Sequence, residues 1–161
     1  MDVREAAGRE ASPSAGVIDS QSVKTTESGG PRGGACPRAV LRTDPWDAGK
    51  KIKGRKRHIL TDRIGLPVGM FVHPAAIQDR DGAPALLAHV RSALPWLRHV
   101  FADGGYAGDK LPDALKGLGD WTIEIVKRSD AAKGFVLLPR RWVVERTLTW
   151  LDRNPTIGQG C

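Results

Sequence analysis

Residues 16–24 read GVIDSQSVK, in which the apolar residues Val17 and Ile18 run directly into the carboxylate of Asp19. The apolar start and the small polar exit predict a strand that ends near Lys24. An ion that leaves water needs a partner, so a carboxylate inside a strand requires a compensating group. This stretch therefore predicts the first strand of the fold and marks Asp19 as a candidate functional acid.

The chain beyond this strand alternates between strand and helix patterns. Alternation or short apolar runs predict four further strands, over residues 50–62, 66–75 (a buried strand), 98–108 and 121–128. Apolar positions at helical spacing predict three helices, over residues 79–94, 111–118 and 140–153. The order βββαβαβα implies an α/β fold, with a mixed central sheet of about five strands flanked by helices.

Composition predicts one domain with irregular flanks. The 161 residues suffice for one core of ordinary size. Residues 1–15 are polar and rich in Ala, which predicts a disordered N-terminal segment, and the Gly and Pro of residues 27–48 predict a loop insert. No apolar run approaches the roughly 20 residues of a membrane helix, and the start lacks a secretory signal. Cys36 and Cys161 form no metal or disulfide spacing, which fits a reducing cytosol.

Basic residues outnumber acidic ones. The 25 Lys and Arg residues against 18 Asp and Glu give a formal net charge of +7, which is typical of proteins with a phosphate-rich partner. The densest basic run lies within residues 50–57 and includes Lys53, Arg55, Lys56 and Arg57. Two interpretations stay open: the run contacts DNA phosphates, or it is a solvated, charged edge strand that resists aggregation.

Two further acids stand at positions suited to chemistry. Asp103 follows the apolar end of a predicted strand and precedes two glycines, and Glu145 lies in the last predicted helix. Ligands collect beyond the carboxyl ends of strands in open sheets, and two or three carboxylates suffice for Mg²⁺, which keeps several waters. Each acid also has an ordinary interpretation, Asp103 as a turn former and Glu145 as the partner of Arg141 one helical turn earlier.

Five stretches together resemble the catalytic core of DDE transposases from bacterial insertion sequences, in particular the insertion-sequence-five family. They are GVIDSQSVKTT at 16–26, DAGKKIKGRKRHILTD at 47–62, IQDRDGA at 77–83, FADGGYAG at 101–108 and LPRRWVVERTLTWL at 138–151. The third stretch also reads as the start of a helix, because acids are favoured in a first turn, and we favour that interpretation.

The resemblance implies a ribonuclease-H-like catalytic domain over residues 16–153 that carries out DNA transposition. It implies that Asp19, Asp103 and Glu145 are catalytic and bind Mg²⁺, for which Mn²⁺ can substitute. The implied partner is DNA, both the terminal inverted repeats of the element and the target. The residues expected to contact phosphates are basic: Lys24, Lys53, Arg55, Lys56, Arg57, Arg141 and Arg153. A homodimer in the bacterial cytoplasm, at the nucleoid, is a further expectation.

Both ends of the chain depart from the family pattern. Only 18 residues precede Asp19, too few for a folded DNA-binding domain. Residues 154–161 resemble nothing in the family, and Pro155 is expected to stop the preceding helix. These departures predict a truncated core, either active in cleavage and strand transfer or an inactive remnant. The alternatives are a non-catalytic basic DNA-binding module and a plain nuclease of the same fold.

Overall fold

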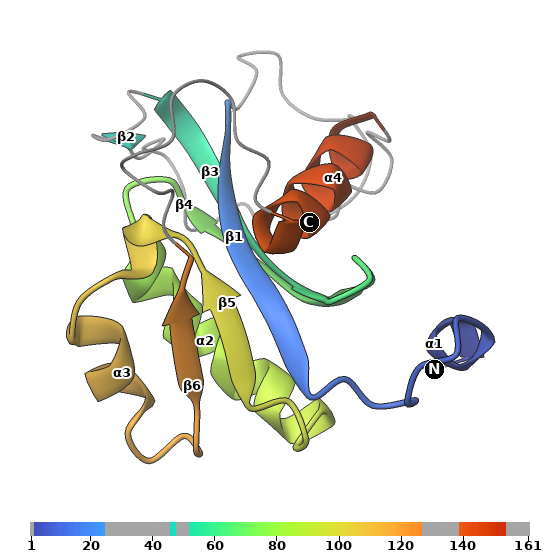
Figure 1. The fold of residues 1–161 in the computed structure, drawn as a ribbon. Coiled ribbons are helices and arrows are strands. Elements are labelled where there is room, and N and C mark those ends of the chain that lie inside the picture. The colour runs from blue at the N-terminus through green and yellow to red at the C-terminus, as the bar shows by residue number, and fades with distance from the viewer. Residues whose placement is uncertain (1, 25–45, 48–51, 127–138, 154–161) are drawn as a thin grey trace, which may run out of the picture.

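The computed structural model describes residues 2–24, 46–47, 52–126 and 139–153. Helices and strands alternate along these residues in the predicted order, with short additional elements between them (Figure 1). The elements are α1 (Asp2–Ala6), β1 (Ala15–Lys24), β2 (Trp46–Asp47), β3 (Ile52–Asp62), β4 (Pro67–Pro74), α2 (Asp79–Ala93), β5 (His99–Ala102), the 3-10 helix η1 (Gly104–Tyr106), α3 (Lys110–Leu115), β6 (Thr122–Ile125) and α4 (Pro139–Arg153).

Strand β1 lies at the centre of a mixed sheet (Figure 1). β3 pairs antiparallel with β1 along most of its length, from Gly16 opposite Asp62 to Lys24 opposite Gly54. On the other side β5 runs parallel to β1, and β6 runs parallel to β5. The strand order is β2-β3-β1-β5-β6, and β4 pairs antiparallel with β3. This arrangement confirms the predicted mixed sheet, to which the two-residue β2 adds a sixth strand within the predicted loop insert.

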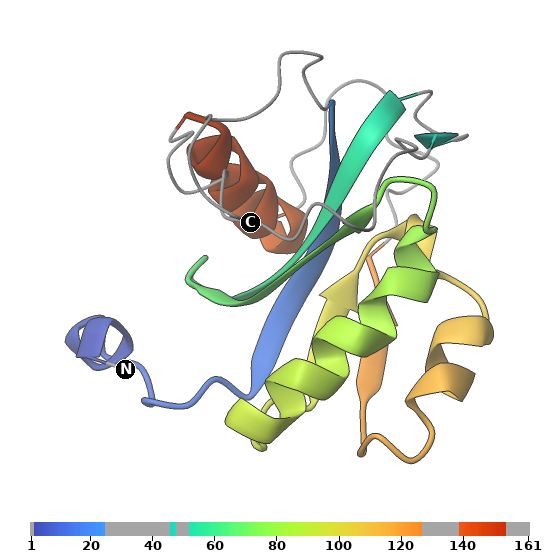
Figure 2. The same cartoon turned by 180° about the vertical axis from the view of Figure 1, so that it is seen from behind.

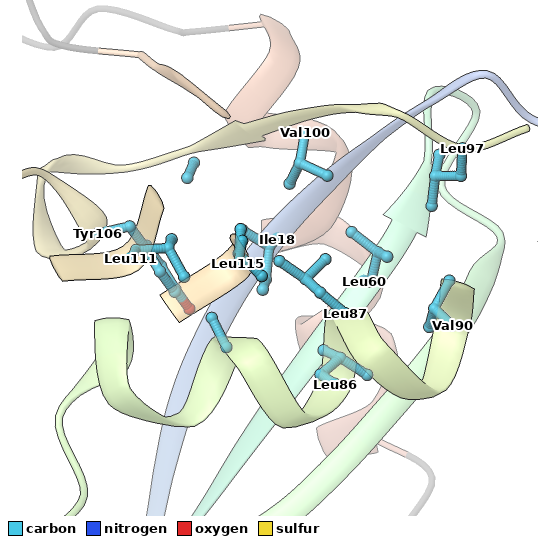
Figure 3. Close-up of a cluster of buried hydrophobic side chains, with 12 residues drawn as sticks. Ile18, Leu60, Leu86, Leu87, Val90, Leu97, Val100, Tyr106, Leu111 and Leu115 are labelled. Carbon is cyan, nitrogen blue, oxygen red and sulfur yellow. The ribbon is translucent and has the colours of Figure 1, made fainter. Parts of the chain in front are cut away.

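Helices cover both faces of the sheet, and the strand alternation decides which side chains each helix meets. α4 lies over one face, whereas α2 and α3 lie over the other (Figures 1 and 2). Ile18, Leu60 and Val100 face α2 and α3, where they form a buried cluster with Leu87 and Leu115 (Figure 3). Because successive residues of a strand point to opposite faces, the residues one position earlier or later face α4.

The second buried cluster lies under α4. Val17, Ile59 and Phe101 from three adjacent strands pack there with Val144 and Leu148 of α4. These apolar positions explain why the last helix folds back onto the sheet, since it can bury its stripe only against a complementary surface. By the alternation of β1, the face that carries Val17 also carries Asp19, two residues further along the strand.

Strand β4 differs from the prediction of a buried strand. Met70, Phe71 and Val72 are each more than 40% exposed, although the stretch is apolar. The physical reason is position, because β4 pairs with β3 and, among the described residues, with no other strand, so it lies at an edge of the sheet. Its contact with α2 is made at Gly69, where an added Cβ would lie 2.4 Å from Cγ2 of Val90.

The N-terminal segment also differs from its prediction. Residues 1–15 were expected to be disordered from their composition, whereas Asp2–Ala6 form the short helix α1 and Ala15 already belongs to β1. Arg4 forms an ion pair with Asp62, whose side chain is fully buried at the β3–β4 turn. Asp62 also accepts hydrogen bonds from the backbone N–H groups of Ile64 and Leu66, both at 2.9 Å. The ion pair between Arg4 and Asp62 thus attaches the N-terminal segment to the sheet, and the backbone hydrogen bonds hold the Asp62 carboxylate in place.

Two other predictions fall wholly or mostly outside the described residues. The loop insert of residues 27–48 is described at Trp46–Asp47, and the tail of residues 154–161 is not described.

The predicted strand over residues 98–108 ends at Ala102, because Asp103 caps the 3-10 helix that follows. The helix predicted over residues 111–118 ends at Leu115, and Leu118 is exposed.

Candidate functional site

Asp19 lies on β1, and Asp103 directly follows the neighbouring parallel strand β5. The pairing of β1 with β5 sets Val17 opposite Phe101, two residues before each acid. Adjacent strands are usually about 4.8 Å apart. The carboxylates of both acids also raise the pKa of the buried Tyr106, so both lie near one phenol although they are 84 positions apart in sequence.

Backbone groups hold both carboxylates. Asp103 is the N-cap of η1, and its Oδ1 accepts a hydrogen bond of 2.8 Å from the backbone N–H of Gly105. Oδ1 of Asp19 accepts one of 2.7 Å from the backbone N–H of Ser20. Such bonds restrict the rotation of each carboxylate. Both side chains are thus held in fixed orientations.

A third carboxylate, that of Asp79, belongs to the same end of the sheet. Burial raises the pKa of Tyr106 well above its ordinary value, and the carboxylates of Asp79, Asp19 and Asp103 raise it further, against an opposing hydrogen bond with Ser20. Tyr106 is almost fully buried and faces α2. All three acids therefore lie within electrostatic reach of one phenol, which stays a neutral donor.

Sequence reasoning assigned Asp79 to a helix start and did not include it among the site residues. The helix start is confirmed, because Asp79 is the first residue of α2. Its proximity to Asp103 depends on how α2 packs against the sheet, which no local pattern encodes. The available signal was the IQDRDGA stretch at 77–83, one of the five that resembled a known family.

Asp19 and Asp103 suit a divalent cation by the chemistry of their donor atoms. Two carboxylates supply hard oxygen ligands, and an ion such as Mg²⁺ fills its remaining positions with water. Within residues 2–24, 46–47, 52–126 and 139–153, no three His, Cys, Asp or Glu side chains lie close enough to hold a metal ion. The assignment of Glu145 as the third ligand stays a prediction.

Helix α4 presents a different acid toward β1. Asp152 accepts hydrogen bonds from Gln21 at 2.5 Å and from Arg57 at 2.6 Å, and Gln21 follows Asp19 on the same face of β1. Glu145, two turns earlier, is exposed. The residues after Glu145 contact the β3–β4 turn, since Thr147 donates to the carbonyl of Gly65 at 2.8 Å. The position of α4 along the sheet thus decides which of its acids lies near Asp19.

The predicted phosphate contacts divide into buried and exposed side chains. Lys56 is 3% exposed and donates to Asp79 at 2.9 Å and to the carbonyl of Ile77 at 2.7 Å. Arg57 is 7% exposed and pairs with Asp152. Both differ from the prediction of DNA-facing cations, because burial of a charged group requires an internal partner and each has found one. Arg55 and Arg153 are exposed.

The side chains of the other three predicted phosphate contacts lie outside those that the structure describes. They are Lys24, Lys53 and Arg141. Their backbones belong to β1, β3 and α4 respectively. The predictions for these three residues therefore stay as they were.

A hydrogen-bonded pair of histidines, His58 fully buried and His73 half-buried, lies against Gly82 of α2. Nδ1 of His58 and Nε2 of His73 are 2.5 Å apart, and Nδ1 of His73 lies 2.9 Å from the carbonyl of Pro74. A carbonyl only accepts, so His73 carries its proton on Nδ1 and accepts from His58. The pKa of His58 is lowered from 6.5 to about 4, chiefly by burial and then by His73, with Asp79 opposing and Lys56 lowering it further.

We expect this pair to make the fold sensitive to acid. His58 stays neutral in the folded chain down to about pH 4. In the unfolded chain it binds a proton below its ordinary pKa of 6.5. The unfolded state therefore binds more protons in this window, and stability falls as the pH falls. Between about pH 7.5 and pH 5 the loss assigned to His58 is about 2 kcal/mol, measured as the free energy of unfolding in urea.

The matched control for this measurement is an exposed histidine. A His58→Gln variant should lose less stability on acidification than the wild type, whereas His89→Gln, at an exposed position of α2, should lose as much as the wild type. Equal acid sensitivity of the wild type and His58→Gln would show that other groups cause the pH dependence.

The chain matches known proteins over most of its length. Residues 10–154 match the model of a family described as Transposase DDE domain. A putative transposase for insertion sequence element IS402 from Burkholderia cepacia is 31% identical over 117 residues, which cover 68% of this chain and 54% of that protein. The chain thus spans about half the length of this curated relative.

A solved structure shares the fold. A chain in the cryo-electron microscopy structure of the simian T-cell lymphotropic virus intasome in complex with PP2A regulatory subunit B56 gamma aligns with a TM-score of 0.51 and 14% identity. The alignment covers 91% of this chain and 44% of that chain. At this identity the likeness concerns the fold alone, which is the ribonuclease-H-like fold of an intasome integrase and confirms the predicted fold class.

None of the described helices is both long and apolar enough to cross a bilayer. The classification rests on the family match over residues 10–154 and on the 31% identity to the IS402 protein. This chain belongs to the Transposase DDE domain family.

Proposed function

We propose that residues 16–153 form the catalytic domain of a DNA transposase in which Asp19 and Asp103 hold a divalent cation. The observation that supports the proposal is the parallel pairing of β1 with β5, which ends two residues before each acid. The family implies use of a divalent metal. We propose Mg²⁺, with Mn²⁺ as a substitute, because carboxylate oxygens suit both ions.

The proposed reaction is cleavage of DNA at the ends of an element, followed by strand transfer. A water oxygen attacks the phosphorus, the P–O3′ bond breaks, and the departing oxygen takes a proton to become a 3′-OH. The oxygen of that 3′-OH then gives up its proton and bonds to a phosphorus of the target DNA; the target's own P–O3′ bond breaks, and the released oxygen takes up a proton. A bound cation would activate the attacking oxygen and stabilise the leaving one. Asp19 and Asp103 supply the negative charge that holds it.

Glu145 is our proposed third ligand. Its support is the position of α4, which lies over the face that carries Asp19 and Asp103. Asp152 is the rival acid on the same helix, because it already bonds to Gln21 on β1. Loss of metal-dependent cleavage in Glu145→Gln, with activity kept in Asp152→Asn, would assign the role to Glu145. The reverse result would assign it to Asp152.

The proposed partners are the terminal inverted repeats of the element and a target DNA. Arg55 and Arg153 support this, because both are exposed cations, and phosphate contacts supply most non-specific affinity. Lys24, Lys53 and Arg141 are proposed contacts on the basis of their positions in sequence. A homodimer that joins two element ends, and membership of the insertion-sequence-five group, belong to the same proposal.

The test is a cleavage assay on duplexes that carry the repeats found beside the gene. We expect cuts at the repeat ends in Mg²⁺ or Mn²⁺, none with chelator, and at least about tenfold less cutting of a duplex with scrambled ends, a difference of about 1.4 kcal/mol. Equal cutting of both duplexes would show a plain nuclease. Salt-sensitive binding without metal-dependent cleavage would show a non-catalytic DNA-binding module, which is favoured by the finding that no three His, Cys, Asp or Glu side chains among the described residues could hold a metal ion.

A further inference from the structure

We infer that Asp79, anchored by Lys56, is a positioning residue that holds the Asp103 turn and adds negative charge beside it. The inference rests on the proposed function, since it concerns the metal site formed by Asp19 and Asp103. Asp79 opens α2, on the opposite side of the sheet from α4. It therefore approaches the Asp103 turn from a helix other than the one that carries Glu145.

The contact lies at Gly105. A Cβ added there would lie 3.0 Å from Oδ1 of Asp103 and 3.1 Å from Oδ2 of Asp79. An oxygen of each carboxylate therefore lies close to the position that a side chain of residue 105 would occupy. Because glycine has no side chain, both oxygens can lie there. The neighbouring Gly104 has no such role, because a Cβ added there meets nothing within 4 Å.

Lys56 fixes Asp79 in this position. Its ammonium is buried and donates to Oδ1 of Asp79 at 2.9 Å and to the carbonyl of Ile77 at 2.7 Å. The oxygen that faces Gly105 is Oδ2, the one that this ion pair does not use. The pair thus compensates the buried charge while Oδ2 stays beside Asp103.

Two effects on the site follow from this arrangement. The carboxylate of Asp79 limits the movement of the Gly104–Tyr106 helix and hence of its N-cap, Asp103. Its charge also adds to the field that attracts a cation, because Coulomb interactions over a few ångströms persist even at high effective dielectric. Asp79 acts on the metal through Asp103 and through this field, and it needs no bond to the ion.

The charge test compares two acids in the first turn of α2. Asp79 pairs with Lys56, and Asp81 pairs with Lys110 at 2.7 Å. We expect Asp79→Asn to weaken Mn²⁺ binding about five- to tenfold, measured by electron paramagnetic resonance of free Mn²⁺. Asp81→Asn should match the wild type within about twofold. Equal affinity of the wild type and Asp79→Asn would overturn the inference.

A double variant separates positioning from simple neutralisation of Lys56. Asp79→Asn alone leaves a buried ammonium without its anion, which destabilises the fold. Lys56→Met combined with Asp79→Asn removes both charges and that penalty. If Asp79 serves only to neutralise Lys56, the double variant will bind Mn²⁺ as the wild type does. We expect it to bind at least about threefold more weakly, since the carboxylate is the nearer of the two charges to Asp103.

A steric test needs no change of charge. Gly105→Ala should push apart the carboxylates of Asp79 and Asp103 and weaken Mn²⁺ binding, whereas Gly104→Ala should leave it unchanged. Equal effects of the two alanines would count against the inference. Asp103→Asn keeps this question distinct from the proposed function. If Asp103→Asn binds Mn²⁺ normally, the metal site itself is wrong; if it loses Mn²⁺ while the Asp79 and Gly105 variants retain it, only the positioning role fails.

Discussion

Replacement of Asp103 by Asn is expected to abolish divalent-ion binding and to reduce DNA cleavage by roughly a thousandfold, about 4 kcal/mol of transition-state stabilisation. The amide has the shape of the carboxylate but no charge, and Asp103 is one of the two proposed ligands, at the end of the strand that pairs with β1. Asn also remains a good N-cap, so the hydrogen bond from Gly105 to Oδ1 can persist. Stability in urea should therefore change by less than about 0.5 kcal/mol.

The measurement is calorimetric titration with Mn²⁺ and Mg²⁺, together with the cleavage assay. Asp120→Asn is the matched control, because Asp120 is an exposed acid just before β6, at the other end of that strand from the site. It should leave both metal binding and cleavage unchanged. Metal binding by Asp103→Asn with the wild-type affinity would contradict the assignment of the site.

Replacement of Gly82 by Ala is expected to destabilise the fold by about 3 kcal/mol, the upper end of the usual cost of overpacking. Alanine is ordinarily the better helix residue, by up to about 1 kcal/mol. At Gly82, however, an added Cβ would lie 2.5 Å from both Cε1 of His58 and Nε2 of His73. The clash falls on the fully buried ring of His58 and on the half-buried ring of His73, which are hydrogen-bonded to each other, so neither can move away cheaply.

Urea unfolding of Gly82→Ala tests whether the substitution lowers the free energy of unfolding. The control is Ala85→Gly, at an exposed position of α2 one turn later, which should cost only the helix-propensity difference of about 1 kcal/mol. A second variant that combines Gly82→Ala with His73→Ala should recover part of the loss, because one of the two clashing rings is gone. Stabilisation by Gly82→Ala alone would mean that α2 does not approach the histidines as described.

Most of the fold could be predicted from periodicity. The apolar start of β1, the helical spacing of Leu86, Leu87 and Val90, and the alternation of β6 each express a local period, which a short segment carries on its own. The exposure of β4 could not be predicted in this way. Its apolar residues indicate a strand, but their exposure depends on which strands pair with it, and pairing involves residues far away in the sequence.

The same division applies to the site. Each of Asp19 and Asp103 could be singled out locally, because an acid stands at the end of an apolar run in both cases. Lys56 and Arg57 looked like DNA contacts because a charged residue in a basic run is ordinarily solvated. Their burial follows from partners on α2 and α4, Asp79 and Asp152, which lie 23 and 95 positions further along the chain.

The amino-acid sequence by itself determined the order of strands and helices, the basic character of the chain, and the two acids at strand ends. Tertiary structure decided which charged groups meet. It placed Asp103 at the end of the strand that pairs with β1, and it added Asp79 through the packing of α2. Among the described residues it gathers no three His, Cys, Asp or Glu side chains closely enough for a metal ion. The physical reason is that periodicity is a property of neighbours in sequence, whereas a metal site depends on distances between elements, which only their packing establishes.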